Sequence, residues 1–162
     1  MQNIIRTLTP KDLEQASKVF TNVFSAAPWN EPWSLQTSSK RLLDISSTPG
    51  YIGIGYFHSD DQMIGFLVGN EEQWADSKSF YINEICVLNN IQQNGIGSSL
   101  LKYLEDILIK REVETVYLST ERGKGKPESF FKKNDFKTNE SRILMTMNLK
   151  TKKNSTVSKE NV

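Results

Sequence analysis

The residues with the clearest chemical potential form the loop Gln92-Gln93-Asn94-Gly95-Ile96-Gly97. An apolar run over 80–88 precedes this loop and an amphipathic run over 96–111 follows it, so the sequence predicts a strand, a glycine turn and a helix. The first N–H groups of a helix lack intrahelical partners and lie at the positive end of its dipole. We therefore expect the backbone of the loop, with Ser98 after it, to bind a phosphate or pyrophosphate group.

The spacing of these glycines excludes two other phosphate-binding motifs. The Walker pattern GxxxxGK[ST] is absent, because no Lys-Ser or Lys-Thr follows a glycine at the required distance. The dinucleotide pattern GxGxxG fails because Gly97 is followed by Ser98, Ser99 and Leu100. The loop also lies past the middle of the chain, whereas a dinucleotide fold carries it after the first strand.

The remaining pattern, Gln-x-x-Gly-x-Gly, resembles the acetyl-CoA pyrophosphate loop of the GNAT superfamily of N-acetyltransferases, [Gln/Arg]-x-x-Gly-x-[Gly/Ala]. A later segment, 127–136, is similar to the family's Ala-x-x-Phe-Tyr-x-Lys-x-Gly-Phe, with Phe130, Lys133 and Phe136 matching. The resemblance covers residues 3–149 and implies acetyl-CoA as co-substrate.

This resemblance has one important departure. Phe131 stands where the family usually has a tyrosine that protonates the departing CoA thiolate. We expect Phe131 to line the cofactor site without acting as an acid, which leaves the general acid unassigned. Pro127 and Asp135 also differ from the family pattern.

Hydrophobic periodicity predicts one α/β domain over residues 1–149. Strands are expected at 4–8, 51–57, 63–69, 79–88, 113–119 and 142–149, with 136–138 as an optional short strand, and helices at 10–25, 34–45, 96–111 and 127–134. This is the GNAT order. It implies a mixed, mostly antiparallel central sheet flanked by helices, with the acetyl-CoA loop between strand 4 and the following helix. Residues 150–162 carry four lysines and one glutamate and are expected to form a disordered basic tail.

Composition limits the class of protein. A chain of 162 residues with 37% hydrophobic and 24% charged residues suits one globular domain. No apolar run approaches the length of a membrane span, and the N-terminus lacks a signal-peptide layout. One cysteine and one histidine argue against a disulfide framework and a metal site. We therefore expect a cytoplasmic protein that does not bind a membrane. Because its net charge is only +1, we also do not expect it to bind nucleic acid. A homodimer stays open.

The charges are unevenly distributed. Between positions 51 and 90 a single base, Lys78, stands against the acids Asp60, Asp61, Glu71, Glu72, Asp76 and Glu84. Bases predominate between 122 and 137. This pattern suits a cationic acceptor and an anionic cofactor at different places, although uneven surface charge without function is the alternative.

Acetyl transfer from a thioester to an amine needs a base, an oxyanion donor and a departing thiolate. Glu84 is the candidate base, because it alternates with Ile82 and Cys86 on an expected apolar face, where burial raises a carboxyl pKa. Pairing of Glu84 with a neighbouring strand is the alternative. Glu71 and Glu72 are further candidates, acting directly, through water or only as a solvated rim.

The remaining candidates serve the thioester and the thiolate. The resemblance implies that the backbone at Cys86 and Val87 pairs with the pantetheine arm. The Cys86 side chain is expected to be a small buried hydrophobe rather than an acetyl carrier. Tyr117 is the candidate to replace the missing acid, with Tyr81 and Tyr103 as alternatives.

Trp29, Glu31 and Trp33 lie in a segment, 26–34, that is broken by two prolines. In the GNAT fold this segment borders the acceptor pocket. Aromatic walls beside a carboxylate suit an ammonium or amino sugar. The alternative is that the tryptophans only fix the segment to the core. We expect one tryptophan to line the pocket and the other to fix the segment.

The sequence as a whole predicts an acetyl-CoA-dependent N-acetyltransferase that acetylates the primary amine of a small, cationic acceptor by direct transfer. The acidic middle and the aromatic segment are similar to those of aminoglycoside N-acetyltransferases. Two alternatives stay open: a protein N-terminal or lysine acetyltransferase, and an acetyl-CoA sensor without turnover, which Phe131 favours.

Overall fold

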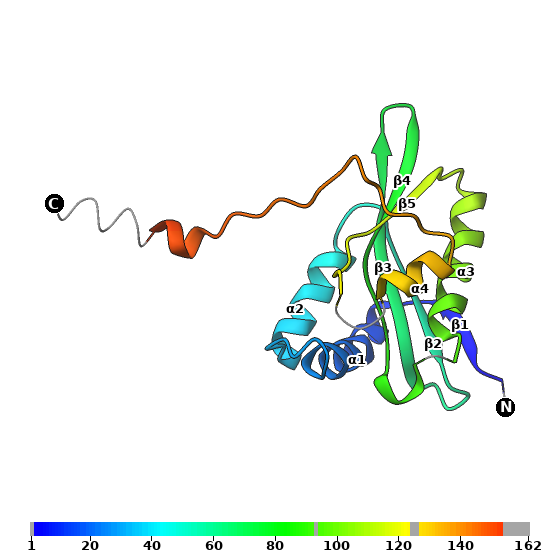
Figure 1. The fold of residues 1–162 in the computed structure, drawn as a ribbon. Coiled ribbons are helices and arrows are strands. Elements are labelled where there is room, and N and C mark those ends of the chain that lie inside the picture. The colour runs from blue at the N-terminus through cyan, green and yellow to red at the C-terminus, as the bar shows by residue number, and fades with distance from the viewer. Residues whose placement is uncertain (1, 93, 124–126, 154–162) are drawn as a thin grey trace.

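A five-stranded sheet forms the centre of the molecule, with helices on both faces (Figure 1). The computed structural model describes residues 2–92, 94–123 and 127–153. The strands are β1 (Ile4–Thr7), β2 (Tyr51–Phe57), β3 (Met63–Trp74), β4 (Ser77–Val87) and β5 (Thr115–Tyr117), and the helices are α1 (Leu13–Ser25), α2 (Leu35–Ser46), α3 (Ile96–Lys110) and α4 (Pro127–Lys133). Strand order follows chain order. β1 to β4 are antiparallel, and β5 is parallel to β4.

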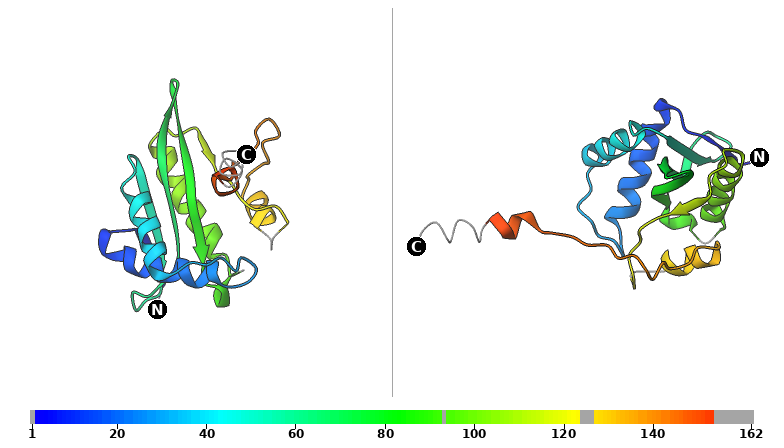
Figure 2. Two further views of the ribbon diagram at one scale, coloured as in Figure 1. Left: turned by 90° about the vertical axis from the view of Figure 1, so that its left-hand side faces the viewer. Right: turned by 90° about the horizontal axis from the view of Figure 1, so that it is seen from above.

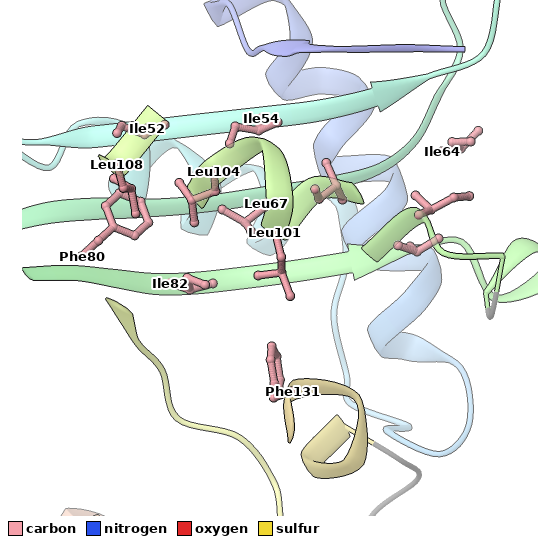
Figure 3. Packing of buried hydrophobic residues seen from close by; sticks show 13 residues of the cluster. Ile52, Ile54, Ile64, Leu67, Phe80, Ile82, Leu101, Leu104, Leu108 and Phe131 are labelled. Atoms are coloured by element: carbon pink, nitrogen blue, oxygen red, sulfur yellow. The ribbon is translucent and has the colours of Figure 1, made fainter. Parts of the chain in front are cut away.

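Two hydrophobic clusters hold the helices to the sheet. Successive side chains of a strand point to opposite faces, so the apolar run at the start of β3 serves both clusters. Leu67 packs in the cluster with α3, whereas Phe66 and Val68 pack in the cluster with α1 and α2. Figure 3 shows strand residues such as Leu67 and Phe80 meeting Leu104 of α3. Burial on both faces makes the centre of the sheet a rigid support.

A bulge in β4 changes which residues share a face. Val68 pairs with Glu84 and Gly69 pairs with Ile82, so Asn83 is an extra residue on β4. Ile82 therefore packs toward α3, whereas Cys86 packs toward α1 and α2. The expectation that Ile82, Glu84 and Cys86 share one face was wrong, because the extra residue reverses the alternation at that point.

β4 and β5 pair over only three residues. Their register runs from Ser79 with Thr115 to Tyr81 with Tyr117. Beyond Tyr81 the strands no longer pair, so this side of β4 has no strand beside it in the described part of the chain. The single crossover between them is α3, whose buried stripe is Ile96, Leu100, Leu101, Leu104 and Leu108.

The C-terminal part of the chain differs from expectation. No strand forms at 142–149 or 136–138. Residues 137–148 are irregular, and residues 149–153 are helical. The segment leaves the domain and runs away from it in both figures (Figures 1 and 2). The strand predicted at 142–149 was wrong, because apolar alternation carries no information about whether a neighbouring strand is present to pair with it. Residues 154–162, most of the expected tail, lie outside the described residues.

No helix in the described ranges combines the length and the apolar character that a membrane crossing requires.

Candidate functional site

A cavity of about 780 Å³ opens where β4 and β5 stop pairing. β4 contributes residues 82–87 to its wall, and the segment after β5 contributes residues 118–121. The start of α3, the segment after α1 and α4 close the other sides. The volume lies within the ~300–1,000 Å³ of small-molecule sites. A smaller depression of about 400 Å³, lined mainly by α2 and by Trp33, lies separately.

The start of α3 presents unpaired backbone donors to this cavity. Gly95 is the N-cap with a φ of 75°, which a residue with a side chain rarely adopts, and no described side chain caps the helix. Gly95, Ile96, Gly97 and Ser98 all line the cavity. The first intrahelical bond runs from the Ser99 N–H to the Gly95 carbonyl, so the preceding N–H groups are available to an anion.

Gly97 has a packing reason as well. A Cβ at this position would lie 2.8 Å from Cζ of Phe130, so only glycine lets the Phe130 ring of α4 lie this close to α3. The two glycines therefore act differently. Gly95 provides the turn, and Gly97 provides the close approach of α4, whose residues form part of the cavity wall.

The polar residues of the loop hold the loop itself. The Gln92 side-chain amide donates to the carbonyl of Val87 at 2.8 Å and to Oδ1 of Asn89 at 2.9 Å. Asn94 donates to the carbonyl of Ile91 at 3.2 Å and is not among the cavity residues. These bonds fix the turn between β4 and α3. Gln93, another predicted cofactor residue, lies outside the described residues.

Glu84 and Arg41 form an ion pair at the cavity wall. Nη2 of Arg41 lies 2.6 Å from Oε1 of Glu84, and Nε donates to the same oxygen at 2.7 Å. The Glu84 side chain is 15% exposed. Burial raises its carboxyl pKa more than Arg41 lowers it, and the nearby negative charge of Glu31 raises it further. A buried carboxylate with a raised pKa can accept a proton near neutral pH.

Sequence reasoning missed Arg41, which lines the smaller depression on α2 and reaches Glu84 from there. Ser38, Leu42 and Ile45 form the buried side of α2. Arg41 lies three residues after Ser38 and four before Ile45, on the border of that stripe. This spacing is the one signal that could have found it. Its partner on β4 is 43 positions away.

The two tryptophans of the segment after α1 have different surroundings. Trp29 and Glu31 line the large cavity together with Glu84. Trp33 packs edge-on against Phe20 at 4.8 Å, and its Nε1 donates to Glu31 at 2.7 Å. Trp33 thus fixes the segment to α1 and orients the Glu31 carboxylate.

Glu71, Glu72 and Tyr117 lie elsewhere, outside the cavity lining. Glu71 is 2.7 Å from Nε of Arg111. Glu72 accepts a hydrogen bond of 2.6 Å from the Tyr117 hydroxyl. Burial and this bond raise the pKa of Tyr117 to about 12, so its hydroxyl keeps its proton and donates the hydrogen bond to Glu72. The structure does not bring these three residues to Glu84.

Cys86, Val87 and Phe131, three of the predicted cofactor residues, line the cavity. Burial, with the charge of Glu84, raises the pKa of the Cys86 thiol well above its usual value, so the thiol stays protonated. Phe131 packs against Phe130 and Phe136 at 5.1 and 5.5 Å between ring centroids. Figure 3 shows its ring on α4 directed toward Leu101 of α3, which belongs to the same hydrophobic cluster.

Residues 16–136 match the family model of the acetyltransferase (GNAT) family. The chain belongs to the GNAT acetyltransferase family. None of the curated proteins compared with it matches its sequence. The observed five-stranded sheet with β4 and β5 parallel confirms the GNAT-like fold that the sequence predicted.

Solved structures share this GNAT fold over most of the chain. An aminoglycoside acetyltransferase from an uncultured soil metagenomic sample, in complex with sisomicin, has a TM-score of 0.71 at 17% identity and covers 90% of this chain and 95% of its own. A GNAT family acetyltransferase from Staphylococcus aureus has 0.68 at 16% and covers 91% and 100%. A transcriptional regulator from Bacillus halodurans has 0.74 at 17% and covers 91% and 99%. At these identities the likeness concerns the fold alone.

GNAT proteins use acetyl-CoA as co-substrate, and the cavity has the features that such a molecule requires. The uncapped start of α3 offers donors for the pyrophosphate. The unpaired side of β4 beyond Tyr81 offers backbone groups to an extended chain with amides. Both features face one cavity of adequate volume, so the residues present fit the molecule.

Proposed function

We propose that this chain transfers an acetyl group from acetyl-CoA to the primary amine of a small, cationic acceptor, with Glu84 as general base. The observation that carries the proposal is the position of Glu84. Its buried carboxylate, with a raised pKa, lies in the same cavity as the start of α3 on one side and Trp29 and Glu31 on the other.

The co-substrate side of the site consists largely of backbone. Acetyl-CoA supplies the acetyl group as a thioester. The N–H groups at the start of α3 bind its pyrophosphate, and the β4 backbone around Cys86 and Val87 lies along the pantetheine arm. Fixed backbone donors are effective because they need no reorganisation when charge develops on the carbonyl oxygen.

The acceptor side must attract an ammonium and then remove its proton. The ring of Trp29 and the carboxylates of Glu31 and Glu84 provide a negative, partly apolar wall. A protonated amine cannot attack, so Glu84 accepts its proton. The raised pKa brings Glu84 closer to the pKa at which general-base catalysis near neutral pH is most efficient.

Direct attack by the amine is favoured over an acetyl-cysteine intermediate. The buried Cys86 thiol has a raised pKa and is therefore a weak nucleophile. With Phe131 lacking a hydroxyl, the thiolate leaves without a tyrosine proton and takes its proton from water.

An acetyl-CoA sensor is the second candidate, and Phe131 favours it. Its ring completes an aromatic cluster with Phe130 and Phe136, and it brings no acidic proton to the cavity. Binding without turnover would need the start of α3 and the β4 edge but would not need Glu84.

A thiol-release assay with a panel of amines tests the proposal. The enzyme should release CoA faster with polyamines and aminoglycosides as acceptors than with neutral amines, amino acids or lysine peptides. Glu84→Gln should lower kcat by roughly 100-fold or more, while calorimetry shows little change in acetyl-CoA affinity. Glu121→Gln is the matched control, because Glu121 lines the same cavity but is exposed. Acetyl-CoA binding with no release for any amine would support the sensor instead.

A further inference from the structure

Among the described residues, two buried side-chain oxygens lack a hydrogen-bond partner, Oδ1 of Asn83 and the hydroxyl of Tyr51. A buried polar atom without a partner destabilises the fold, because it has lost its bonds to water and gained none. Most buried polar groups in folded proteins are paired, so each exception calls for a cause. The two positions differ in one respect, since Asn83 lines the large cavity and Tyr51 does not.

Asn83 is the extra residue of the bulge in β4. It lies between Ile82, which packs toward α3, and Glu84. β5 stops pairing with β4 at Tyr81, so no strand lies beside Asn83 on that side in the described ranges. Bulges are common next to active sites, where they re-aim a side chain. The bulge therefore inserts a neutral amide next to Glu84 in the wall of the cavity.

A purely structural role does not account for this amide. An asparagine at an irregular point of the chain often bonds to nearby backbone and holds the chain there. The Asn83 oxygen makes no such bond to any residue that the structure describes, so it does not hold the bulge in this way. What the oxygen lacks is a donor. Glu84 cannot supply one, because an ionised carboxylate only accepts hydrogen bonds.

An amine that enters the cavity brings the missing donor. A primary ammonium carries three N–H groups and no acceptor. Arg41 occupies Oε1 of Glu84 at 2.6 and 2.7 Å, which leaves Oε2 for the proton that the base removes. A second accepting oxygen beside Glu84 would hold another N–H and so orient the lone pair that forms. A neutral amide suits this task, because it binds the amine without competing for its proton.

We propose that Asn83 is an acceptor-binding residue, whose Oδ1 accepts a hydrogen bond from the primary amine while Glu84 removes its proton. The terminal torsion of asparagine is broad, so a turn about it brings Oδ1 from the wall into the cavity. The free protein thus carries an unpaired oxygen that the acceptor pairs on binding. This role rests on the proposed function, since it requires an amine beside Glu84.

Asn83→Leu tests the role, because leucine keeps the branched shape and removes the polar atoms. Loss of an unpaired buried oxygen should raise Tm by about 2–4 °C. Calorimetry should show that spermidine, the probe, binds about tenfold or more weakly. Tyr51→Phe is the matched control, because it removes the other unpaired oxygen away from the cavity. It should also raise Tm and should leave spermidine affinity unchanged.

A quaternary analogue separates the hydrogen bond from the charge. Spermidine methylated until every nitrogen is a quaternary ammonium keeps its charges but has no N–H, so Asn83→Leu should not weaken its binding. Equal losses for the two ligands, or a lower Tm in Asn83→Leu, would overturn the role of Asn83.

Affinity and turnover separate this role from the proposed function. Turnover by the wild type, with equal spermidine affinity in Asn83→Leu, would overturn the role of Asn83 alone. Spermidine binding that depends on Asn83, without release of CoA, would support the role and overturn acetyl transfer alone. A wild type that does not bind spermidine would overturn both the role and the cationic acceptor.

Discussion

Arg41 controls how readily Glu84 accepts a proton. Burial raises the Glu84 pKa, and the guanidinium opposes this shift through charge and hydrogen bonds. The pair also fixes the carboxylate, since two nitrogens of Arg41 contact one oxygen. Both contacts are made to Oε1, so the carboxylate is held by one oxygen and Oε2 is left for a proton.

We predict that Arg41→Gln moves the acid limb of the kcat/KM profile to higher pH. Without the guanidinium, burial acts on Glu84 unopposed and its pKa rises further, so the base is deprotonated only at higher pH. Stability should fall by about 1–3 kcal/mol at neutral pH, between the values for exposed and buried pairs, because Arg41 is 39% exposed. Kinetics from acid to alkaline pH and urea titrations measure both effects.

The sign of the stability effect provides a further check. A carboxyl with a raised folded pKa destabilises the fold as pH rises through that pKa, so the cost of Arg41→Gln should vanish below the ordinary carboxyl pKa of ~4.3. Lys40→Gln is the control, because Lys40 pairs with the exposed Asp44 on the same helix and not with Glu84. If the acid limb of the kcat/KM profile stays in place in Arg41→Gln, or moves equally in Lys40→Gln, Arg41 does not set the pKa of Glu84.

The sequence predicted that Glu84 would be buried but wrongly placed Ile82 on the same face. Alternation alone placed Glu84 with Ile82 and Cys86, and the bulge at Asn83 turns Ile82 to the opposite face. A polar asparagine in the middle of a strand was a weak sign of irregular pairing. The register that defines a bulge depends on the opposite strand, which periodicity in β4 cannot reveal.

At the level of elements, our proposal makes co-substrate binding depend on the start of α3. Ser98 and Ser99 both lie in its first turn, but only Ser98 lines the cavity. We predict that Ser98→Glu raises the Kd for acetyl-CoA by roughly tenfold or more, because a carboxylate then faces the pyrophosphate. Calorimetry measures the affinity.

Ser99→Glu is the matched control for this prediction. It adds the same charge to the same turn, away from the cavity, and costs only the Ser99 hydroxyl bond to the Gly95 carbonyl. Both variants should keep or slightly raise Tm, since acids near a helix start stabilise it by ~0.3–1 kcal/mol. Equal affinities for the two variants would remove the start of α3 from the binding site.

A second element-level contact joins β1 to α1 and makes stability depend on acid. Asp12 lies 2.7 Å from Nη1 of Arg6 and accepts bonds from Thr9. The Arg6 bonds lower its pKa to about 2. A lowered pKa stabilises the fold above the unfolded value of ~3.9, and this stabilisation is lost as pH falls toward 2.

We therefore predict that Asp12→Asn destabilises the protein by on the order of 2 kcal/mol at neutral pH, and that the difference disappears between pH about 4 and 2. Urea titrations across that range test it. Asp44→Asn, which breaks an exposed pair, should cost less than ~0.5 kcal/mol at any pH. A constant penalty for Asp12→Asn down to pH 2 would point to packing rather than charge.

Most elements were predictable because their sequences show hydrophobic periodicity and are bounded by turn-forming residues. β2 was predicted at its observed bounds, and α3 ended one residue earlier than expected. β3 is five residues longer than predicted, because its polar end pairs with β4 in a hairpin that the apolar pattern did not include. The final strand failed for the opposite reason, since residues 142–149 have the apolar pattern but pair with no strand in the part of the chain that the structure describes.

At the scale of the whole molecule, the acidic middle of the chain divides into separate groups. Glu71 is neutralised by Arg111 and Lys78, and Glu72 is held by Tyr117. Of the acids that the sequence placed around the acceptor, Glu31 and Glu84 line the cavity. The run of acids in the sequence therefore overstated the negative field at the acceptor side, because a base that is distant in sequence, Arg111, pairs with Glu71 in the fold.

This division leads to a prediction about the acceptor. Glu31→Gln should raise KM for a cationic amine about two- to fivefold, which corresponds to ~0.5–1 kcal/mol for a partly exposed charge pair. KM for acetyl-CoA should stay unchanged. Asp76→Asn removes the same charge from the exposed turn between β3 and β4, outside the cavity. It should leave both constants unchanged if local charge, rather than the overall field, attracts the acceptor.

Salt separates these two sources of attraction. Added salt screens exposed charges within a Debye length of ~8–10 Å, so KM for a cationic amine should rise with ionic strength in the wild type. It should rise less in Glu31→Gln, because part of the attraction that salt screens is already gone. Asp76→Asn should keep the wild-type slope. A KM insensitive to salt, or equal slopes in all three proteins, would show that neither Glu31 nor its charge selects the acceptor.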